Sequence, residues 1–140
     1  MRNRSRIAFA CTAAAVATIA FTSPASAAAG GTASCSTTGA RGSMGATRPS
    51  GDLWPYQEFK IALSVTDTSA DGHHVRIRFL SKAVGSSATT TWAWHSLTAG
   101  SGETLTLSTT AQTSNGIAET GVEVARFEGD TKLNSCTDWT

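Results

Sequence analysis

Aromatic side chains are the residues of this chain best suited to recognise a ligand, because exposed rings stack against sugars and anchor protein partners. Trp54 and Tyr56 flank Pro55 in a segment rich in Gly, Arg and Pro, and we expect both to be binding residues in a surface loop. Trp92 and Trp94 are two residues apart in a predicted strand, so their rings are expected to stand on the same face. They form either an exposed two-ring binding platform or part of a buried core.

A pair of arginines forms the next candidate site. Arg76 and Arg78 alternate with apolar residues, which places both on the outward face of one predicted strand. Lys82 follows further along this strand, and Glu123 lies on another. Charges of alternating sign on neighbouring strands are typical of a solvated face, and the alternative is a binding site for a partner.

The chain carries no motif of a known catalytic class. It has no G-x-S-x-G elbow, phosphate loop, H-E-x-x-H pair or EF-hand loop, so we expect no catalytic residues, no enzyme activity and no cofactor. His73 and His74 are adjacent and therefore point to opposite faces of a strand. A zinc site could be assembled only from His74, His95 and a loop carboxylate such as Asp71. We interpret the histidines as solvated strand residues and expect no metal site.

The elements that position these residues are predicted to be strands. The chain beyond residue 27 is rich in Thr, Ser and Gly and alternates apolar with polar residues, without a sustained helical period. We predict an all-β fold, an antiparallel seven-stranded, Ig-like β-sandwich, with a small open β-barrel as the alternative. The expected strands are Ala33–Thr38, Phe59–Val65, His74–Phe79, Thr89–Leu97, Glu103–Thr109, Gly121–Glu128 and Thr131–Asp138.

Turn residues predict how some of these strands are connected. Asp71-Gly72 lies in the Thr66–His73 connection, which suggests that the second and third strands pair as antiparallel neighbours. Gly129-Asp130 suits a type II′ turn that closes the last hairpin. Gly39–Gln57 is predicted to be one long surface loop, because Pro55 excludes a central strand there.

The predicted core combines the apolar faces of these strands. Val122 and Val124 share one parity and Phe127 has the other, so we expect a β-bulge near Ala125 that returns Phe127 to the core. The expected core residues are Phe59, Ile61, Leu63, Val65, Val75, Ile77, Phe79, Leu105, Leu107, Val122, Val124 and Phe127.

The first 27 residues are expected to be removed from the 140-residue chain. Met1–Arg6 carries three arginines, Ile7–Phe21 is apolar and Thr22–Ala27 ends in small residues, which is the pattern of a secretory signal peptide. Residues 28–140 then form one domain with 11 − 3 = 8 basic and 10 acidic residues, a net charge of −2. A mildly acidic chain is a poor polyanion binder, so we expect no nucleic acid partner. No second apolar run is long enough to span a membrane after signal cleavage. The sequence leaves the oligomeric state open.

Two cysteines remain after signal cleavage. Cys11 lies within the apolar segment and leaves with it, so the only possible bridge joins Cys35 to Cys136, 101 residues apart. This bridge requires the first and last strands to lie side by side. Disulfides persist in oxidising compartments, and the expected localisation is secreted and extracellular.

Three short stretches carry a resemblance to known secreted proteins: His74–Phe79, Trp92–His95 and Leu133–Trp139. Their combination resembles the small single-disulfide proteins of unassigned function that filamentous, Streptomyces-like actinomycetes secrete. In size and export the chain is also similar to the subtilisin-inhibitor and tendamistat types of hydrolase inhibitor from the same bacteria. Those inhibitors normally have two bridges, and the tendamistat type inhibits through Trp-Arg-Tyr, whereas this chain has one bridge and Trp92-Ala93-Trp94.

The sequence therefore supports two functional hypotheses. The first is a secreted, non-catalytic interaction domain that binds an extracellular protein or a cell-wall glycan through its loop aromatics. The alternative is an inhibitor of a secreted hydrolase, with Gly39–Gln57 as the inserting segment.

Overall fold

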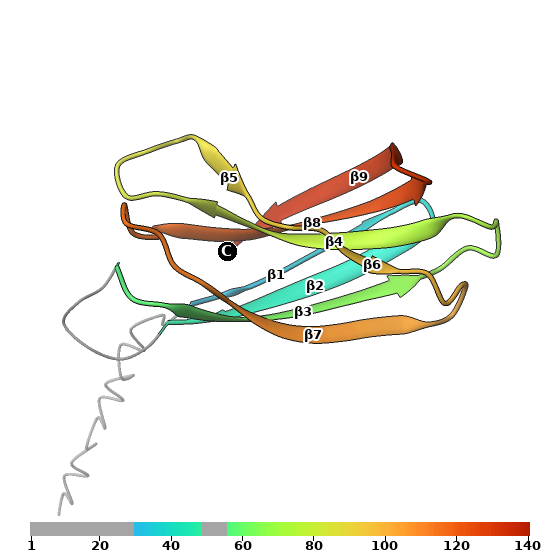
Figure 1. Cartoon of the computed structure of the whole chain (residues 1–140), viewed down its shortest axis with the longest axis horizontal. Helices are drawn as coiled ribbons and strands as arrows, with labels where there is room; N and C mark the ends of the chain where they lie inside the picture. The colour runs from blue at the N-terminus through green and yellow to red at the C-terminus, as the bar shows by residue number, and fades with distance from the viewer. Residues whose placement is uncertain (1–29, 49–55) are drawn as a thin grey trace, which may run out of the picture.

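The described residues form a two-layered sandwich of nine strands (Figure 1). The structure is a computed structural model and describes residues 30–48 and 56–140, so Trp54 and the predicted signal peptide lie outside the described residues. No helix occurs within the described ranges. The strands are β1 (Thr32–Thr37), β2 (Ala40–Thr47), β3 (Phe59–Asp67), β4 (His74–Lys82), β5 (Thr89–Thr91), β6 (His95–Leu97), β7 (Thr104–Ala111), β8 (Glu119–Glu128) and β9 (Thr131–Trp139).

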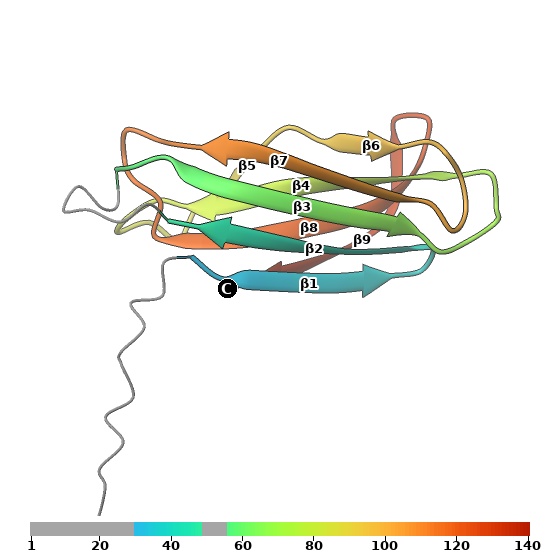
Figure 2. The same cartoon turned by 90° about the horizontal axis from the view of Figure 1, so that it is seen from below.

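The strands divide into two antiparallel sheets. One sheet has the order β1-β2-β3-β7, and the other has the order β5-β4-β8-β9, with β6 also pairing with β4. The sheets remain separate layers and do not close into a barrel, which confirms the predicted antiparallel sandwich with two more strands than expected. Figure 2 shows β1 and β9 together along one edge of the sandwich and β7 and β6 along the other.

The core lies between the two sheets and follows the predicted alternation. Successive inward positions of β3, β4 and β8 are almost completely buried, because their β-branched and aromatic side chains interdigitate across the layers. Leu105 and Leu107 of β7 are only partly buried against this core. The confirmed core residues are Phe59, Ile61, Leu63, Val65, Val75, Ile77, Phe79, Val122 and Val124.

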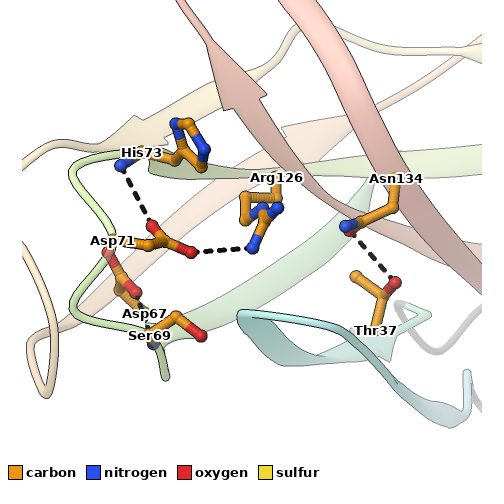
Figure 3. Close-up of polar contacts among 7 residues, drawn as sticks. All are labelled: Thr37, Asp67, Ser69, Asp71, His73, Arg126 and Asn134. Atoms are coloured by element: carbon orange, nitrogen blue, oxygen red, sulfur yellow. Dashed lines mark hydrogen bonds and ion pairs between the residues drawn. The ribbon is translucent and has the colours of Figure 1, made fainter.

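The predicted pairing of β3 with β4 is wrong. These strands lie in different sheets, so the chain between them crosses from one layer to the other. Asp71 stabilises this crossing: one carboxylate oxygen accepts from the His73 amide at 3.1 Å, and the other accepts from Arg126 of β8 at 2.7 Å (Figure 3). The Asp-Gly pair thus serves an inter-sheet connection, which turn chemistry alone does not distinguish from a hairpin.

The prediction that Gly39–Gln57 is a single loop is also wrong. Its first part, Ala40–Thr47, forms β2 between β1 and β3. β2 is poor in β-branched residues, and Gly42 stands where the neighbouring atoms leave no room for a side chain. A Cβ atom on Gly42 would lie 2.7 Å from Val124 Cγ2 and 2.8 Å from the Ser64 carbonyl oxygen. The strand was missed because close packing requires a glycine at position 42, and glycine has a low strand propensity.

Gly42→Ala is expected to destabilise the domain by about 1–3 kcal/mol, since the added methyl group overpacks the core. Gly45→Ala in the same strand is the matched control, because a Cβ atom there meets no atom within 4 Å. Urea unfolding monitored by tryptophan fluorescence measures both. Equal midpoints for the two variants would contradict the close packing of β2.

Phe127 is buried as predicted, at 4% exposed, but it lies on the outer face of the sheet and not between the two layers. The expected bulge near Ala125 is absent from β8. Phe127 pairs with His74, and directly opposite residues share a face, so its ring lies on the outer surface of the sheet. The inward position falls to Arg126, which reaches out of the end of the core to Asp71 (Figure 3). The irregularity occurs in β9 instead, where Leu133 is the extra residue opposite Arg126 and Phe127.

The predicted disulfide and closing hairpin are confirmed. Cys35 and Cys136 are bonded, with their Cα atoms 5.9 Å apart, and so join the edge strands β1 and β9 of the two sheets. Gly129 has a φ of 55° while Asp130 does not adopt a positive φ, which is the pattern of a type II′ turn.

Candidate functional site

Trp92 and Trp94 were predicted to share one face of a strand, but in the structure they lie on different faces. The expected strand Thr89–Leu97 is divided into β5 and β6, and the residues between them belong to neither. Trp92 packs toward the core: its ring centroid lies 5.6 Å from that of Phe79, and its indole Nε1 donates to Ser81 Oγ at 3.0 Å. Trp94 lies on the outer surface, 5.3 Å from the Phe127 ring. The two-ring platform is therefore excluded, and Trp92 is a core residue.

Arg78 is held on the outer face of β4 by two partners, an aromatic ring and a carboxylate. Its guanidinium lies 4.3 Å from the centre of the Trp94 ring. Its Nε donates to one oxygen of Glu123 at 2.7 Å, and Nη2 forms an ion pair with the same oxygen at 2.6 Å. The other oxygen of Glu123 accepts from Lys132 at 2.8 Å. The Glu123 side chain is only 7% exposed, so this is a partly buried charge network and not the solvated face that the sequence suggested.

The pKa of Glu123 reflects this network. Burial alone would raise it, but the hydrogen bonds from Lys132 and Arg78, together with their charges, outweigh burial and lower the pKa below its ordinary value. Glu123 therefore remains ionised and pairs with both cations in neutral solution.

Arg76 occupies the next outward position of β4 and is equally engaged. Its guanidinium lies 4.2 Å from the centre of the Phe127 ring, and Nη2 donates to Asp130 and to the Gly129 carbonyl, both at 2.8 Å. Its Nε donates to Nε2 of His74 at 3.0 Å, a geometry that requires an unprotonated nitrogen on His74. Desolvation of the ring, and next the charge of Arg76, lower the pKa of His74.

A third cation–aromatic pair extends the same face. Lys82 Nζ lies 4.3 Å from the centre of the Trp139 ring, which itself covers Gly121. Sequence reasoning missed Phe127 and Trp139 as members of this face. The register between β4, β8 and β9 could have identified them, because it places these aromatic side chains beside the outward-facing cations of β4.

We call this arrangement the cation–aromatic face: Arg76, Arg78 and Lys82 with Phe127, Trp94 and Trp139. The sequence left open whether Arg76 and Arg78 bind a partner. In the structure, both guanidinium groups already form hydrogen bonds and ring contacts with residues of the same domain. The side chains of these two arginines are 17% and 18% exposed. The arrangement stabilises the outer surface of the sheet as a second, smaller cluster outside the core.

Among the described residues, Tyr56 is the predicted site residue that remains available to a ligand. Its side chain is 54% exposed, and it borders a hollow of about 490 Å³. The residues that line this hollow come from the segment before β3, from the β4–β5 loop and β5, and from the β7–β8 loop, and these segments lie at the same end of the sandwich (Figure 1). Gln112 fixes the residue by donating from Nε2 to the Tyr56 carbonyl at 2.9 Å. Hydroxyl, amide and small apolar groups line the hollow, from Tyr56, Ala83, Val84, Ser86, Ala88, Thr90, Ser114 and Asn115.

The loops that form this hollow are ordered by their own hydrogen bonds. In the β4–β5 loop the Ser86 amide donates to the Ala83 carbonyl at 3.1 Å, and the Ser86 hydroxyl accepts from the Ala88 amide at 3.1 Å. In the β7–β8 loop Thr113 Oγ1 donates to the Gly116 carbonyl at 3.0 Å. A pre-ordered site loses little conformational entropy when it binds.

Two other hollows, of about 470 and 450 Å³, lie over the outer surface of the β1-β2-β3-β7 sheet. The described residues that line them are mostly small or polar and include no aromatic side chain, so they offer no stacking surface. Within residues 30–48 and 56–140, no group of three or more His, Cys, Asp or Glu side chains could hold a metal ion. The same part of the chain contains no helix long and apolar enough to cross a membrane.

No protein-family model, curated protein or solved structure matches this chain. The structural class of this protein is therefore described from its own fold and surface features. It is an antiparallel two-sheet sandwich whose edge is closed by one disulfide, with an aromatic-bordered hollow at one end. The disulfide is consistent with an oxidising, extracellular environment.

Proposed function

We propose that this protein is a secreted, non-catalytic binding domain that recognises a glycan of the cell wall through the loop end bearing Tyr56. The observation that carries the proposal is the exposed Tyr56 ring beside a hollow lined by hydroxyl and amide groups. A sugar presents an apolar ring face and a rim of hydroxyls, so an aromatic ring with neutral polar neighbours complements both.

The chemistry of the hollow favours a neutral ligand. Among the described residues, its lining includes Ser86, Thr90, Ser114 and Asn115 and no charged side chain. These groups can donate and accept hydrogen bonds without requiring a charged partner. Trp54 remains a proposed second aromatic contact, because it lies two residues before Tyr56 in the sequence.

Tyr56→Ala is expected to weaken binding to washed bacterial cell walls about 30-fold, the effect of losing roughly 2 kcal/mol at a central aromatic contact. Co-sedimentation of the 28–140 domain with the walls measures this. Tyr56→Trp should retain binding because it preserves a stacking ring. Leu133→Ala is the matched control: Leu133 is 40% exposed but does not line the hollow, and its loss should leave the affinity unchanged.

Two outcomes would contradict the glycan proposal. Equal sedimentation of Tyr56→Ala and the unmodified domain would remove Tyr56 from the binding site. Inhibition of a secreted protease or glycosidase by the purified domain, lost in Tyr56→Ala, would instead support the alternative of a hydrolase inhibitor that uses the same loop end.

A further inference from the structure

The sheet edges of this sandwich differ in how they are protected against pairing with another strand. Unpaired backbone groups at an edge are a template for another strand, and stable monomers usually protect them with charges, bulges, breaks or covering groups. β9 carries Lys132, Asp138 and the bulge at Leu133. The β5/β6 edge is interrupted between the two strands. β1 is covered by β9, through the disulfide and through the Ser34 amide, which donates to Asp138 at 2.9 Å.

β7 has none of these protections. Its eight residues contain no charged side chain and no proline, and its pairing with β3 continues without a register shift over its whole length. Among the described residues β7 pairs only with β3, so alternate backbone groups on its other side have no strand to bond.

The core is also incompletely covered at this edge. Leu105 and Leu107 are only partly buried, whereas the residues directly opposite them on β3, Val65 and Leu63, are 0% and 1% exposed. One further strand beside β7 would cover the two leucines as β7 itself covers β3.

We infer that β7 pairs with β7 of a second copy of this chain in a two-fold symmetric, antiparallel dimer with a continuous eight-stranded sheet. With the axis at Leu107, the two Leu107 side chains meet on the inner face. On the outer face Thr106 lies opposite Ser108 of the second copy. Hydroxyl pairing of this kind already exists between β3 and β7, where Thr66 Oγ1 and Thr104 Oγ1 are 2.8 Å apart. The absence of charge on β7 means that self-pairing brings no like charges together.

The two-fold symmetry of the dimer determines where its two Tyr56 hollows lie. Gln112, which directly follows β7, holds Tyr56 at one end of this strand. Antiparallel pairing therefore directs the two Tyr56 hollows to opposite ends of the dimer. The dimer itself does not depend on what these hollows bind.

Light scattering coupled to size-exclusion chromatography at about 50 μM should give twice the mass of the 28–140 chain. Thr106→Lys/Ser108→Lys places lysines opposite one another across the axis and should convert the protein to a monomer with an unchanged circular dichroism spectrum. Thr32→Lys/Ser34→Lys makes the same change on exposed positions of β1, at the other edge of the sheet, and should remain dimeric.

Three results would overturn the inference. They are a monomer for the unmodified chain, a dimer that survives Thr106→Lys/Ser108→Lys, and an open-ended assembly in place of a dimer. Hydrogen exchange provides a second readout, since the outward amides of β7 should exchange more slowly as the protein concentration rises.

Discussion

Removal of the Cys35–Cys136 disulfide is expected to lower the melting temperature of the domain by about 15–20 °C. The bridge closes a chain segment of 101 residues. In the chain-entropy model, closing a loop of this length stabilises the folded state by about 4–5 kcal/mol, mainly by restricting the unfolded chain. For a domain of this size, 1 kcal/mol corresponds to a change of about 4 °C. Cys35→Ala/Cys136→Ala measured by thermal and urea unfolding tests this, and alanine avoids burying a new hydroxyl.

The control for this prediction separates chain closure from the loss of local contacts. Thr37→Ala removes a 3.1 Å hydrogen bond to Asn134, which also joins β1 to β9 (Figure 3), while the disulfide remains. We expect this variant to cost only about 1 kcal/mol. The cysteine variant should also unfold with a larger urea m-value, because its unfolded chain exposes more surface. An unchanged melting temperature in the cysteine variant would refute the role of the bridge.

The core and the bridge could be predicted from sequence because each depends on a local or unique signal. Period-two alternation in Phe59–Val65 and His74–Phe79 identifies their buried faces without knowledge of their neighbours. The disulfide is the single pairing that two cysteines allow. The choice between a hairpin and an inter-sheet crossing at Asp71-Gly72 depends on which sheet each strand joins. That choice is made by packing across the whole sandwich and has no local signal.

The candidate site could be predicted only in part, for the same reason. Tyr56 was predicted correctly as exposed, because a ring beside proline in a polar segment has little opportunity to be buried. The Trp92–Trp94 face failed because one strand was assumed where the structure has a break. Phe127 was predicted correctly as buried, but strict alternation from Val124 places it on the outer face of the sheet, beside Arg76 and His74. Its residue type predicted the burial, and the strand alternation indicates the face of the sheet on which it is buried.

Glu123→Gln is expected to destabilise the domain by about 3 kcal/mol, because it leaves the partly buried Arg78 guanidinium without its counter-charge. Glu119→Gln is the matched control. Glu119 also pairs with a β4 cation across the same two strands, Lys82, but its side chain is 51% exposed against 7% for Glu123. An exposed pair contributes less than about 1 kcal/mol. Urea unfolding at neutral pH measures both, and equal losses would show that burial of the Glu123 network does not matter.

The dependence of stability on pH provides the second test of this network. Because the pKa of Glu123 is lower in the folded than in the unfolded chain, the unfolded state takes up more protons as the solution is acidified. The stabilisation from Glu123 is therefore present above about pH 4.3, the ordinary glutamate pKa, and is lost as the pH falls through the folded-state value. Glu123→Gln should flatten the stability profile in this acidic range.

His74 acts in a separate range of pH. Its lowered pKa means that the folded state resists protonation, so stability should begin to fall as the pH drops below about 6.5. Glu123→Gln should leave the loss of stability below about pH 6.5 unchanged. His74→Gln should remove that loss and leave the one below about pH 4.3. A single decline that Glu123→Gln does not alter would mean that the charge network on the outer face of β4 and β8 does not stabilise the fold.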